Sequence, residues 1–453
     1  MNETLLDSTV RDLDYRLAVA QATGRVPSMV AGVVRGGRLV WSRGRGVVDG
    51  AEPGPDTQYR VGSITKTFVA VAVMRLRDEG VVGLNDPLEA HLPGTPHGAA
   101  TIAQLLSHTG GVGAELEGSW WERSPGASAE QWRRRLTPPV ARPGAGHHYS
   151  NVGFSLLGAM VARLRGRDWF DVVDAEILAP LGMRRTTLLP KEPCAAGFAV
   201  HPFADVVMPE TVADTAAMGP AGQLWSCVAD LARWVAFASG DTADVLAPDT
   251  LAQMRAPQAI ADTAAWTYAA GLGWQLHRTD NRVLCGHGGS MPGFQAGIWV
   301  DAASTTGAVS MHNATTTSAS GGFGAAGLIA AVDRAEPRPP APWTPLDSVE
   351  AGLLEVTGTW HWGTSTVTIH ATRDGGLRME AVSGMASDSR FRPNGDGTFT
   401  GLDGYHAGET LRVARDDHGT ATHLSVNTFV LTRRPYQPYD TVPGGVEAGW
   451  PVE

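Results

Sequence analysis

Lysine is scarce in this sequence, and its scarcity sets one lysine apart. The 453 residues include 36 lysines and arginines, but only Lys66 and Lys191 are lysines. An arginine side chain stays protonated in proteins and cannot act as a base, whereas a desolvated lysine amine can lose its proton. A lysine at position 66 of a chain that otherwise uses arginine suggests that the amine itself is required.

Cysteine is also rare. Cys194, Cys227 and Cys285 are odd in number and widely spaced, so neither a disulfide framework nor the paired spacing of a zinc site is visible. This usage fits a reducing compartment. We therefore expect no metal ion and no bound cofactor.

Basic clusters and long apolar runs are missing as well. The formal net charge is −10, which argues against nucleic acid as a partner. No run of about 18 apolar residues could cross a bilayer, and residues 1–8 lack the basic and apolar regions of a signal peptide. We expect a soluble, cytoplasmic protein that binds no membrane.

The chain is long enough for two domains, and its composition changes near residue 340. Residues 1–334 mix helical periodicity with β-type runs, which predicts an α+β domain. Residues 335–346 form a proline-rich linker that we expect to be stiff and extended. Residues 347–453 contain short alternating runs between Gly, Asn and Asp turns, which predicts an all-β sandwich or small barrel.

The predicted elements of the first domain place strands at both ends and helices between them, which favours one sheet assembled from distant parts of the chain. The predicted helices are 10–24, 63–79, 102–107, 151–164, 169–178, 228–237 and 325–334, and the predicted strands are 29–34, 38–42, 58–61, 272–276, 283–285, 296–300 and 308–311. The predicted strands of the second domain are 356–362, 365–371, 376–381, 390–392, 398–402, 410–415 and 422–432.

The sequence Ser63-x-x-Lys66 opens one of these helices. Side chains three residues apart on a helix lie on one face, one turn from each other. A serine hydroxyl becomes a good nucleophile when a neighbouring base takes its proton, and a neutral amine can be that base. The alternative is a serine that caps the helix, followed by a solvated lysine.

Two further stretches carry candidate chemistry. Tyr149-Ser150-Asn151 precedes a predicted helix, and a tyrosine hydroxyl can relay a proton. His287-Gly288-Gly289-Ser290 follows a strand-like run, where glycines would let a substrate lie against a strand edge and leave N–H groups free for an oxyanion. Taken singly, Tyr149 could be a core tyrosine, and the second stretch could be a hairpin turn with a surface histidine.

Together, Ser63-x-x-Lys66, Tyr149-x-Asn151 and His287-x-Gly289 resemble the motif series of the serine β-lactamase and penicillin-binding-protein superfamily, in particular its class C-like members. Residues 101–111 and 220–233 also look like that superfamily, and the resemblance spans about residues 10–334. It implies a β-lactamase/transpeptidase-like catalytic domain, with an antiparallel sheet and a helical subdomain.

The resemblance also implies a role for each motif residue. Ser63 would be the acylated nucleophile and Lys66 its base. Tyr149 would relay protons, and Asn151 would contact the substrate amide.

The third motif would form one side of the acyl site. His287 occupies the position where penicillin-binding enzymes usually have lysine, so its neutral form would hold a free substrate carboxylate poorly. The backbone N–H groups of Ser63 and Ser290 would form the oxyanion hole beside Gly289. Gly222 would lie on the neighbouring loop.

The two-domain chain further resembles the penicillin-binding-protein-type thioesterases, which are stand-alone cyclases of non-ribosomal peptides with a lipocalin-like C-terminal domain. This implies a small linear peptide substrate, held as a thioester on the phosphopantetheine of a peptidyl carrier protein. Its D-configured C-terminal residue would be joined head to tail. Trp225, with Trp120 and Trp121, could exclude water, and Arg434 could contact the acyl residue. Each tryptophan could equally be a core or rim residue, and Arg434 part of a surface pair with Arg433.

Other functions remain open at this point. A D-stereospecific peptidase, amidase or esterase of the same fold would release its product to water. A DD-carboxypeptidase or a β-lactamase fits less well, because such enzymes act outside the cell membrane and no export signal is recognisable. A pseudoenzyme with a peptide-binding β-domain is disfavoured by the complete set of Ser63, Lys66 and Tyr149.

Overall fold

The computed structural model describes residues 4–279, 282–315, 324–336, 342–346, 348–349, 351–437 and 440–441. The chain divides into two compact units, Met1–Arg338 and Pro339–Glu453, which we call the N-terminal unit and the barrel unit and describe separately. The division lies within the stretch 335–346, and the proline-rich residues 337–341 are outside the described residues.

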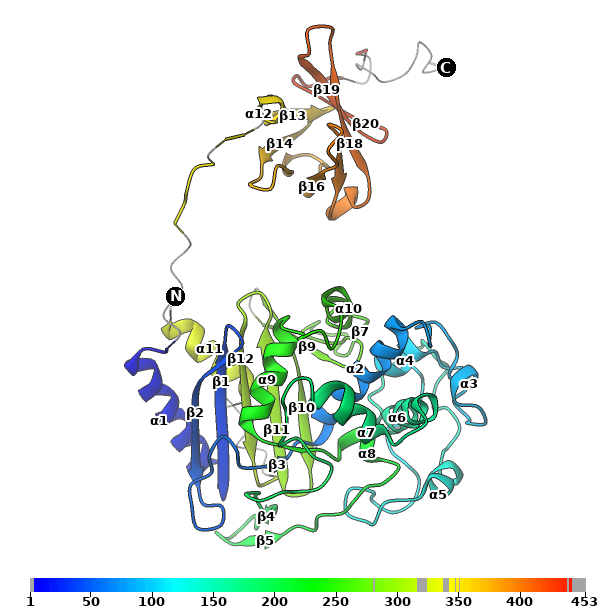
Figure 1. The fold of residues 1–453 in the computed structure, drawn as a ribbon, viewed down its shortest axis with the longest axis vertical. Helices are drawn as coiled ribbons and strands as arrows, with labels where there is room; N and C mark the ends of the chain where they lie inside the picture. The colour runs from blue at the N-terminus through cyan, green and yellow to red at the C-terminus, as the bar shows by residue number, and fades with distance from the viewer. Residues whose placement is uncertain are drawn as a thin grey trace. The chain divides into compact units, whose positions relative to one another are not determined.

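An eight-stranded antiparallel sheet forms the middle of the N-terminal unit (Figure 1). Its first two strands are joined by Gly36-Gly37, both with positive φ, as a tight hairpin requires. Strands from the two ends of the unit lie side by side, which confirms the prediction of one sheet built from distant parts of the chain. Its order is β2 (Arg38–Gly46), β1 (Ser28–Arg35), β12 (Thr306–His312), β11 (Phe294–Asp301), β10 (Arg282–Met291), β9 (Gln275–Thr279), β8 (Tyr268–Ala270) and β7 (Ala259–Ile260).

Helices cover both faces of the sheet (Figure 1). On one face, α1 (Asp7–Thr23) and α11 (Ala325–Ala335) contact each other and the strands. Their apolar sides form one core cluster that includes Leu13, Leu17 and Ile329. On the other face, α9 (Val228–Ser239) packs on β1 and β12.

The remaining helices of this unit form a helical region that meets the sheet where the 3-10 turn η1 (Gly62–Ile64) contacts β10. This turn continues into α2, whose side chains are almost all buried. The region contains α2 (Thr65–Asp78), α3 (Leu88–His91), α4 (Ile102–Leu106), α5 (Ala129–Arg134), α6 (Asn151–Arg165), α7 (Trp169–Val173), the π-helix η2 (Asp174–Leu178), α8 (Gly219–Gly222) and α10 (Pro248–Met254), with the short strand pairs β3 (Tyr59–Arg60)/β6 (Trp225–Ser226) and β4 (Phe198–Val200)/β5 (Val207–Pro209). None of the described helices combines the length and the apolar character that a membrane span needs.

The barrel unit is a closed antiparallel barrel of eight strands. The sequence predicted its last two strands as one run over 422–432, which is wrong because Asn427 turns the chain with a left-handed φ of 49°. The elements are α12 (Ala351–Val356), β13 (Gly358–Trp362), β14 (Ser365–Ala371), β15 (Leu377–Ser383), β16 (Ser389–Pro393), β17 (Phe399–Gly401), the 3-10 turn η4 (Gly404–His406), β18 (Thr410–Arg415), β19 (Ala421–Val426) and β20 (Phe429–Thr432).

Candidate active site

Ser63 lies where a tight turn becomes a helix. Gly62 has a φ of +53°, in the left-handed region that favours glycine, and η1 then continues directly into α2. The backbone N–H groups at a helix N-terminus have no partner within the helix. Since the Ser63 side chain is only half-buried, its hydroxyl lies within reach of a substrate.

Lys66 is completely buried, and all three acceptors around it are uncharged oxygens. Its Nζ donates to Ser63 Oγ at 2.9 Å, to Asn151 Oδ1 at 2.7 Å and to the carbonyl oxygen of Ala221 at 2.6 Å. Burial lowers the pKa of Lys66 to about 7, and the negative charge of Glu115 is the largest opposing effect. A neutral amine is therefore well populated near pH 7, and it is placed to take the Ser63 proton.

Tyr149 immediately precedes Ser150, which is the N-cap residue of α6. The Ser150 hydroxyl accepts from Gly153 N–H at 2.8 Å and donates to the carbonyl of Gly113 at 2.7 Å. The Tyr149 ring centroid is 5.0 Å from the Nζ atom of Lys66. Burial raises the pKa of Tyr149 and a hydrogen bond with Ser63 opposes the rise, so the phenol stays protonated and can pass a proton on.

His108 packs against the ring of Tyr149. The sequence analysis gave this histidine no role. The two ring centroids are 4.3 Å apart, and His108 has a left-handed φ of 59°. Its Nδ1 accepts from the backbone N–H of Ser150 at 3.1 Å, which places the proton of the neutral ring on Nε2. Burial lowers the pKa of His108 well below its usual value. The sequence feature that could have pointed to His108 is its position directly before the turn Thr109-Gly110-Gly111.

Glu115 is a second residue that the sequence did not reveal. Its Oε1 accepts from Asn151 Nδ2 and its Oε2 from Trp121 Nε1, each at 2.7 Å. These bonds orient the Asn151 amide so that its oxygen faces Lys66. The loop around Glu115 has no periodic pattern, so nothing in the sequence distinguished this carboxylate from Glu117, which lies two residues further on and is likewise exposed.

Strand β10 brings the third motif against the Ser63 turn. A Cβ added at Gly289 would lie 1.9 Å from the carbonyl oxygen of Val61 and 3.2 Å from the backbone nitrogen of Ser63. A Cβ at Gly62 would lie 2.5 Å from the backbone nitrogen of Ser290. The two glycines thus let strand and turn pack backbone to backbone, and the N–H groups of Ser63 and Ser290 lie near each other, as an oxyanion hole requires.

His287 is 2% exposed, and β10 continues from Arg282 to Met291 through the whole motif. The alternative of a surface histidine is therefore wrong, and the hairpin turn lies just beyond the motif, at Pro292-Gly293 between β10 and β11. Its Nδ1 lies 2.5 Å from the carbonyl oxygen of Gly288, and since a carbonyl only accepts, Nδ1 carries the proton. Burial, reinforced by the charge of Lys66, lowers the pKa of His287 to about 3, so the ring is neutral and its Nε2 can accept a hydrogen bond.

Gly222 packs against the Ser63 turn, whereas Trp225 lies in the core. A Cβ at Gly222 would lie 3.2 Å from the Met291 sulfur and 3.5 Å from the backbone of Gly62. Trp225 is 1% exposed and stands edge-on to Phe294, with ring centroids 5.1 Å apart. The expectation that Trp225 excludes water from the acyl site needs correction, because its indole is part of the core.

Trp120 and Trp121 differ in burial. Trp120 is 56% exposed, whereas Trp121 is 7% exposed and held by Glu115. Trp121 is therefore the tryptophan that is tied to the site.

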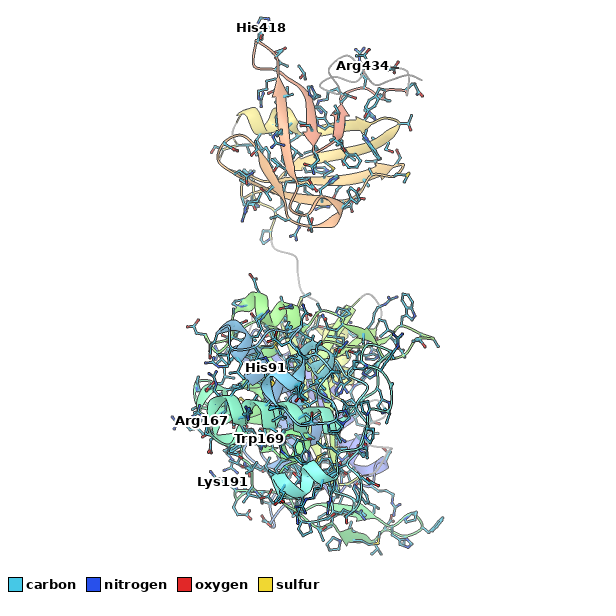
Figure 2. The ribbon with its side chains drawn as sticks, turned by 90° about the vertical axis from the view of Figure 1, so that its right-hand side faces the viewer. His91, Arg167, Trp169, Lys191, His418 and Arg434 are labelled. Carbon is cyan, nitrogen blue, oxygen red and sulfur yellow. The ribbon has the colours of Figure 1, made fainter. Side chains whose placement is uncertain are left out.

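Arg434 belongs to the barrel unit, in the segment that follows β20, and is exposed (Figure 2). Its neighbour Arg433 is held by its own unit. The Arg433 guanidinium lies 3.8 Å from the Trp360 ring centroid and donates to the carbonyls of Thr357 and Thr359 at 2.9 and 3.0 Å. A contact between Arg434 and the acyl residue stays a prediction.

Comparison with known proteins gives matches for both units. The family model described as "Beta-lactamase" matches residues 10–332, and a "Domain of unknown function (DUF7586)" matches residues 349–433. Esterase EstB of Burkholderia gladioli is 35% identical over 225 residues, which are 43% of this chain and 57% of the esterase. The chain thus spans less than two thirds of this curated relative.

Two solved structures are similar to the chain over different lengths. SurE is 25% identical with a TM-score of 0.60 and covers 94% of this chain and 99% of its own. A D-stereospecific amidohydrolase from Streptomyces sp. is 27% identical with a TM-score of 0.58 and covers 67% of this chain and 94% of its own. With a family model that matches most of its length, and with the arrangement of Ser63, Lys66 and Tyr149 described above, the chain belongs to the β-lactamase family.

Proposed function

We propose that this member of a serine hydrolase and acyltransferase family is a peptide macrocyclase. It takes a linear non-ribosomal peptide from the phosphopantetheine thioester of a peptidyl carrier protein, holds it on Ser63 and closes it head to tail. The C-terminal residue of the peptide is D-configured.

The observation that carries this proposal is the charge pattern around the nucleophile. Lys66 has a pKa of about 7, and His287 is neutral at any pH well above 3. Glu115 and Glu122 act on Lys66 as negative charges. Such surroundings attract the free amine of a peptide and offer little to a free carboxylate. This favours attack by an N-terminal amine over the carboxylate-bearing substrates of DD-carboxypeptidases and β-lactamases.

The first half of the reaction is acylation. Lys66 accepts the Ser63 hydroxyl proton as Oγ bonds to the thioester carbonyl carbon, and the oxyanion is held by the backbone N–H groups of Ser63 and Ser290. The carbon–sulfur bond then breaks. The thiol leaves with a proton that Lys66 returns through Tyr149.

The second half closes the ring. The N-terminal amine of the bound peptide attacks the Ser63 ester, the ester carbon–oxygen bond breaks, and the amine proton passes by Tyr149 to restore the serine hydroxyl. The Nε2 lone pair of His287 can accept a hydrogen bond from the attacking amine. Tethering of amine and ester in one molecule supplies a high effective concentration, which favours the amine over water.

The likeness to known structures supports this choice. SurE matches nearly the whole chain, barrel unit included. One of its structures contains D-Leu. The second candidate is a D-stereospecific amidohydrolase, which is favoured by the Streptomyces structure, although that match covers 67% of this chain.

A matched set of peptidyl thioester mimics separates the two candidates. A peptide with a D-configured C-terminal residue and a free N-terminus should give mainly macrocycle. Its L-terminated partner should barely acylate Ser63, because inversion moves the side chain into the space between Asn151 and the 287–290 edge. The N-acetylated D-peptide should give slow hydrolysis only.

Mass spectrometry reads both product and acyl-enzyme, and Ser63→Ala is the control that should show neither. Linear acid as the main product of the free-amine D-peptide would assign the amidohydrolase function instead. An adduct on a residue other than Ser63 would refute the acylation scheme itself.

A further inference from the structure

The barrel unit contains an apolar cavity of about 180 Å³. The residues of its wall come from four strands, the loop 385–387 and the turn η4, and they include Trp362, Val367, Met379, Tyr405, His406 and Phe429. The wall runs from solvent into the barrel core. Met385 and Tyr405 are 85% and 70% exposed at its mouth, whereas Val367 and Met379 are 1% and 2% exposed.

Aromatic rings shape the cavity. Phe429 meets the rings of Trp362, Tyr405 and His406 edge-on, with centroid distances of 4.6, 5.7 and 5.6 Å and interplanar angles of 75°, 85° and 81°. Edge-to-face packing is a favoured geometry for aromatic pairs, so a wall of this kind suits another ring. The methionine side chains are flexible and can adapt to its outline.

No Asp, Glu, Lys or Arg is among the described residues that line the cavity. Burial also lowers the pKa of His406, which keeps its imidazole neutral at pH 7. Burying an ionised group without a partner of opposite charge is costly. The cavity therefore disfavours carboxylates, phosphates and ammonium groups.

We propose that this cavity is a binding site for one neutral aromatic ring of about the size of a phenol. An apolar cavity of roughly 150 Å³ in another protein binds benzene, so the volume suits a single ring with a small substituent. Two sources share this chemistry: a free aromatic molecule, and an aromatic side chain presented by a peptide. All residues that line the cavity belong to the barrel unit.

Fluorine NMR of the full-length chain with 4-fluorophenol tests the proposal. The probe signal should broaden and shift on titration, whereas 4-fluorobenzoate, which carries a charge, should not respond. Ala386→Trp fills the half-exposed wall and should weaken binding at least about tenfold, the change that 1.4 kcal/mol produces. Val382→Trp is the matched control, because Val382 is 60% exposed on the same unit and outside the wall, and it should bind within about twofold of the parent.

A third probe assigns the source. A short acetylated peptide amide with 4-fluorophenylalanine should bind at least as tightly as 4-fluorophenol when the natural occupant is a side chain, and more weakly when it is a free molecule. The proposal is overturned when 4-fluorophenol shows no response at millimolar concentration, or when Ala386→Trp, folded by circular dichroism, binds it as well as the parent does.

Discussion

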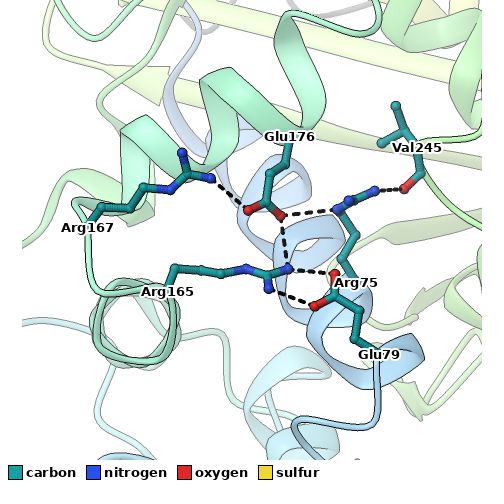
Figure 3. Close-up of polar contacts among 6 residues, drawn as sticks. All are labelled: Arg75, Glu79, Arg165, Arg167, Glu176 and Val245. Atoms are coloured by element: carbon teal, nitrogen blue, oxygen red, sulfur yellow. Dashed lines mark hydrogen bonds and ion pairs between the residues drawn. The ribbon is translucent and has the colours of Figure 1, made fainter.

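The basic side chains at the two ends of helix α2 have opposite surroundings. At the N-terminal end Lys66 is buried among uncharged oxygens, and burial lowers its pKa to about 7. At the C-terminal end the cations are arginines bound to carboxylates (Figure 3). Arg75 Nε lies 3.2 Å from Glu176, and Glu79 accepts from both terminal nitrogens of Arg165 at 2.7 and 2.8 Å.

This difference separates a group kept for chemistry from groups kept for stability. The ion pairs raise the pKa of Arg165 and lower that of Glu79, so both charges persist near pH 7. Cations in the last helical turn also interact favourably with the helix dipole. The burial of Lys66 does the reverse and makes its neutral form available. The sequence shows the same difference, because it uses arginine at almost every basic position and has a lysine at the one where a neutral amine is needed.

The largest effect on acylation of Ser63 should follow when Lys66 is replaced by arginine, the residue that supplies the cations at the C-terminal end of α2. Lys66→Arg keeps a positive charge but removes the titratable amine, because arginine is not deprotonated in proteins. Acylation of Ser63 should fall by roughly 10² to 10⁴, as for loss of a general base. Single-turnover acylation by a thioester mimic, followed by intact-mass spectrometry, measures it.

Lys191→Arg is the matched control, since Lys191 is the other lysine of the chain and is exposed (Figure 2). It should acylate at the parent rate. Near-parent acylation by Lys66→Arg would show that Lys66 acts only through its charge.

The next largest effect on acylation of Ser63 should follow when a methyl group is added at Gly289 of β10. Gly289→Ala would place a Cβ 1.9 Å from the Val61 carbonyl oxygen, so β10 and the Ser63 turn must separate. The backbone N–H groups of Ser63 and Ser290 could then no longer bind the same oxyanion. Acylation should fall by roughly 10² to 10³, as when one oxyanion donor is removed. At Gly288 the nearest atom to a Cβ would be Gln275 Oε1 at 4.0 Å, so Gly288→Ala is the control. Equal rates for the two variants would exclude this oxyanion hole.

The sequence predicted the α+β sheet and the all-β domain because hydrophobic periodicity and turn residues carry that information locally. The three motifs were predictable because their residues and order resemble the motif series of a known superfamily. Glu115 and His108 were not, since a loop carboxylate and a turn histidine gain their roles from packing against Asn151 and Tyr149. Trp225 was misplaced because proximity to a motif in sequence does not tell which way a strand residue points.

A smaller effect should follow when the charge facing Lys66 is removed. Since Glu115 raises the pKa of Lys66, Glu115→Gln should lower it. Acylation requires the neutral amine, so its rate rises with pH through the Lys66 pKa, near 7 in the parent. In the variant this rise should move to lower pH by less than about one unit, and acylation at pH 6 should become up to a few-fold faster.

The pH dependence of single-turnover acylation between pH 5 and 9 measures this shift. Glu117→Gln, on the same loop but not among the charges that act on Lys66, should leave the profile unchanged. A shift to higher pH in Glu115→Gln would contradict the assigned electrostatics.

The smallest effect should come from the C-terminal end of α2, where the charges serve stability. Glu176 is the centre of the cluster, because its carboxylate binds Arg75, Arg165 at 3.0 Å and Arg167 at 2.8 Å (Figure 3). Its side chain is 16% exposed, so screening by water is incomplete. Glu176→Gln keeps the shape and removes the charge, and it should lower the free energy of unfolding of the N-terminal unit by about 1 kcal/mol.

Urea unfolding measures this loss, and 1 M salt should reduce it because salt screens charge interactions. Glu130→Gln is the control, since the pair of Glu130 and Arg134 is 75% exposed on both sides and should give no measurable change. Acylation of Ser63 by Glu176→Gln should equal that of the parent. A loss of acylation in the folded variant would mean that the two ends of α2 are coupled, and the division between chemistry and stability would fail.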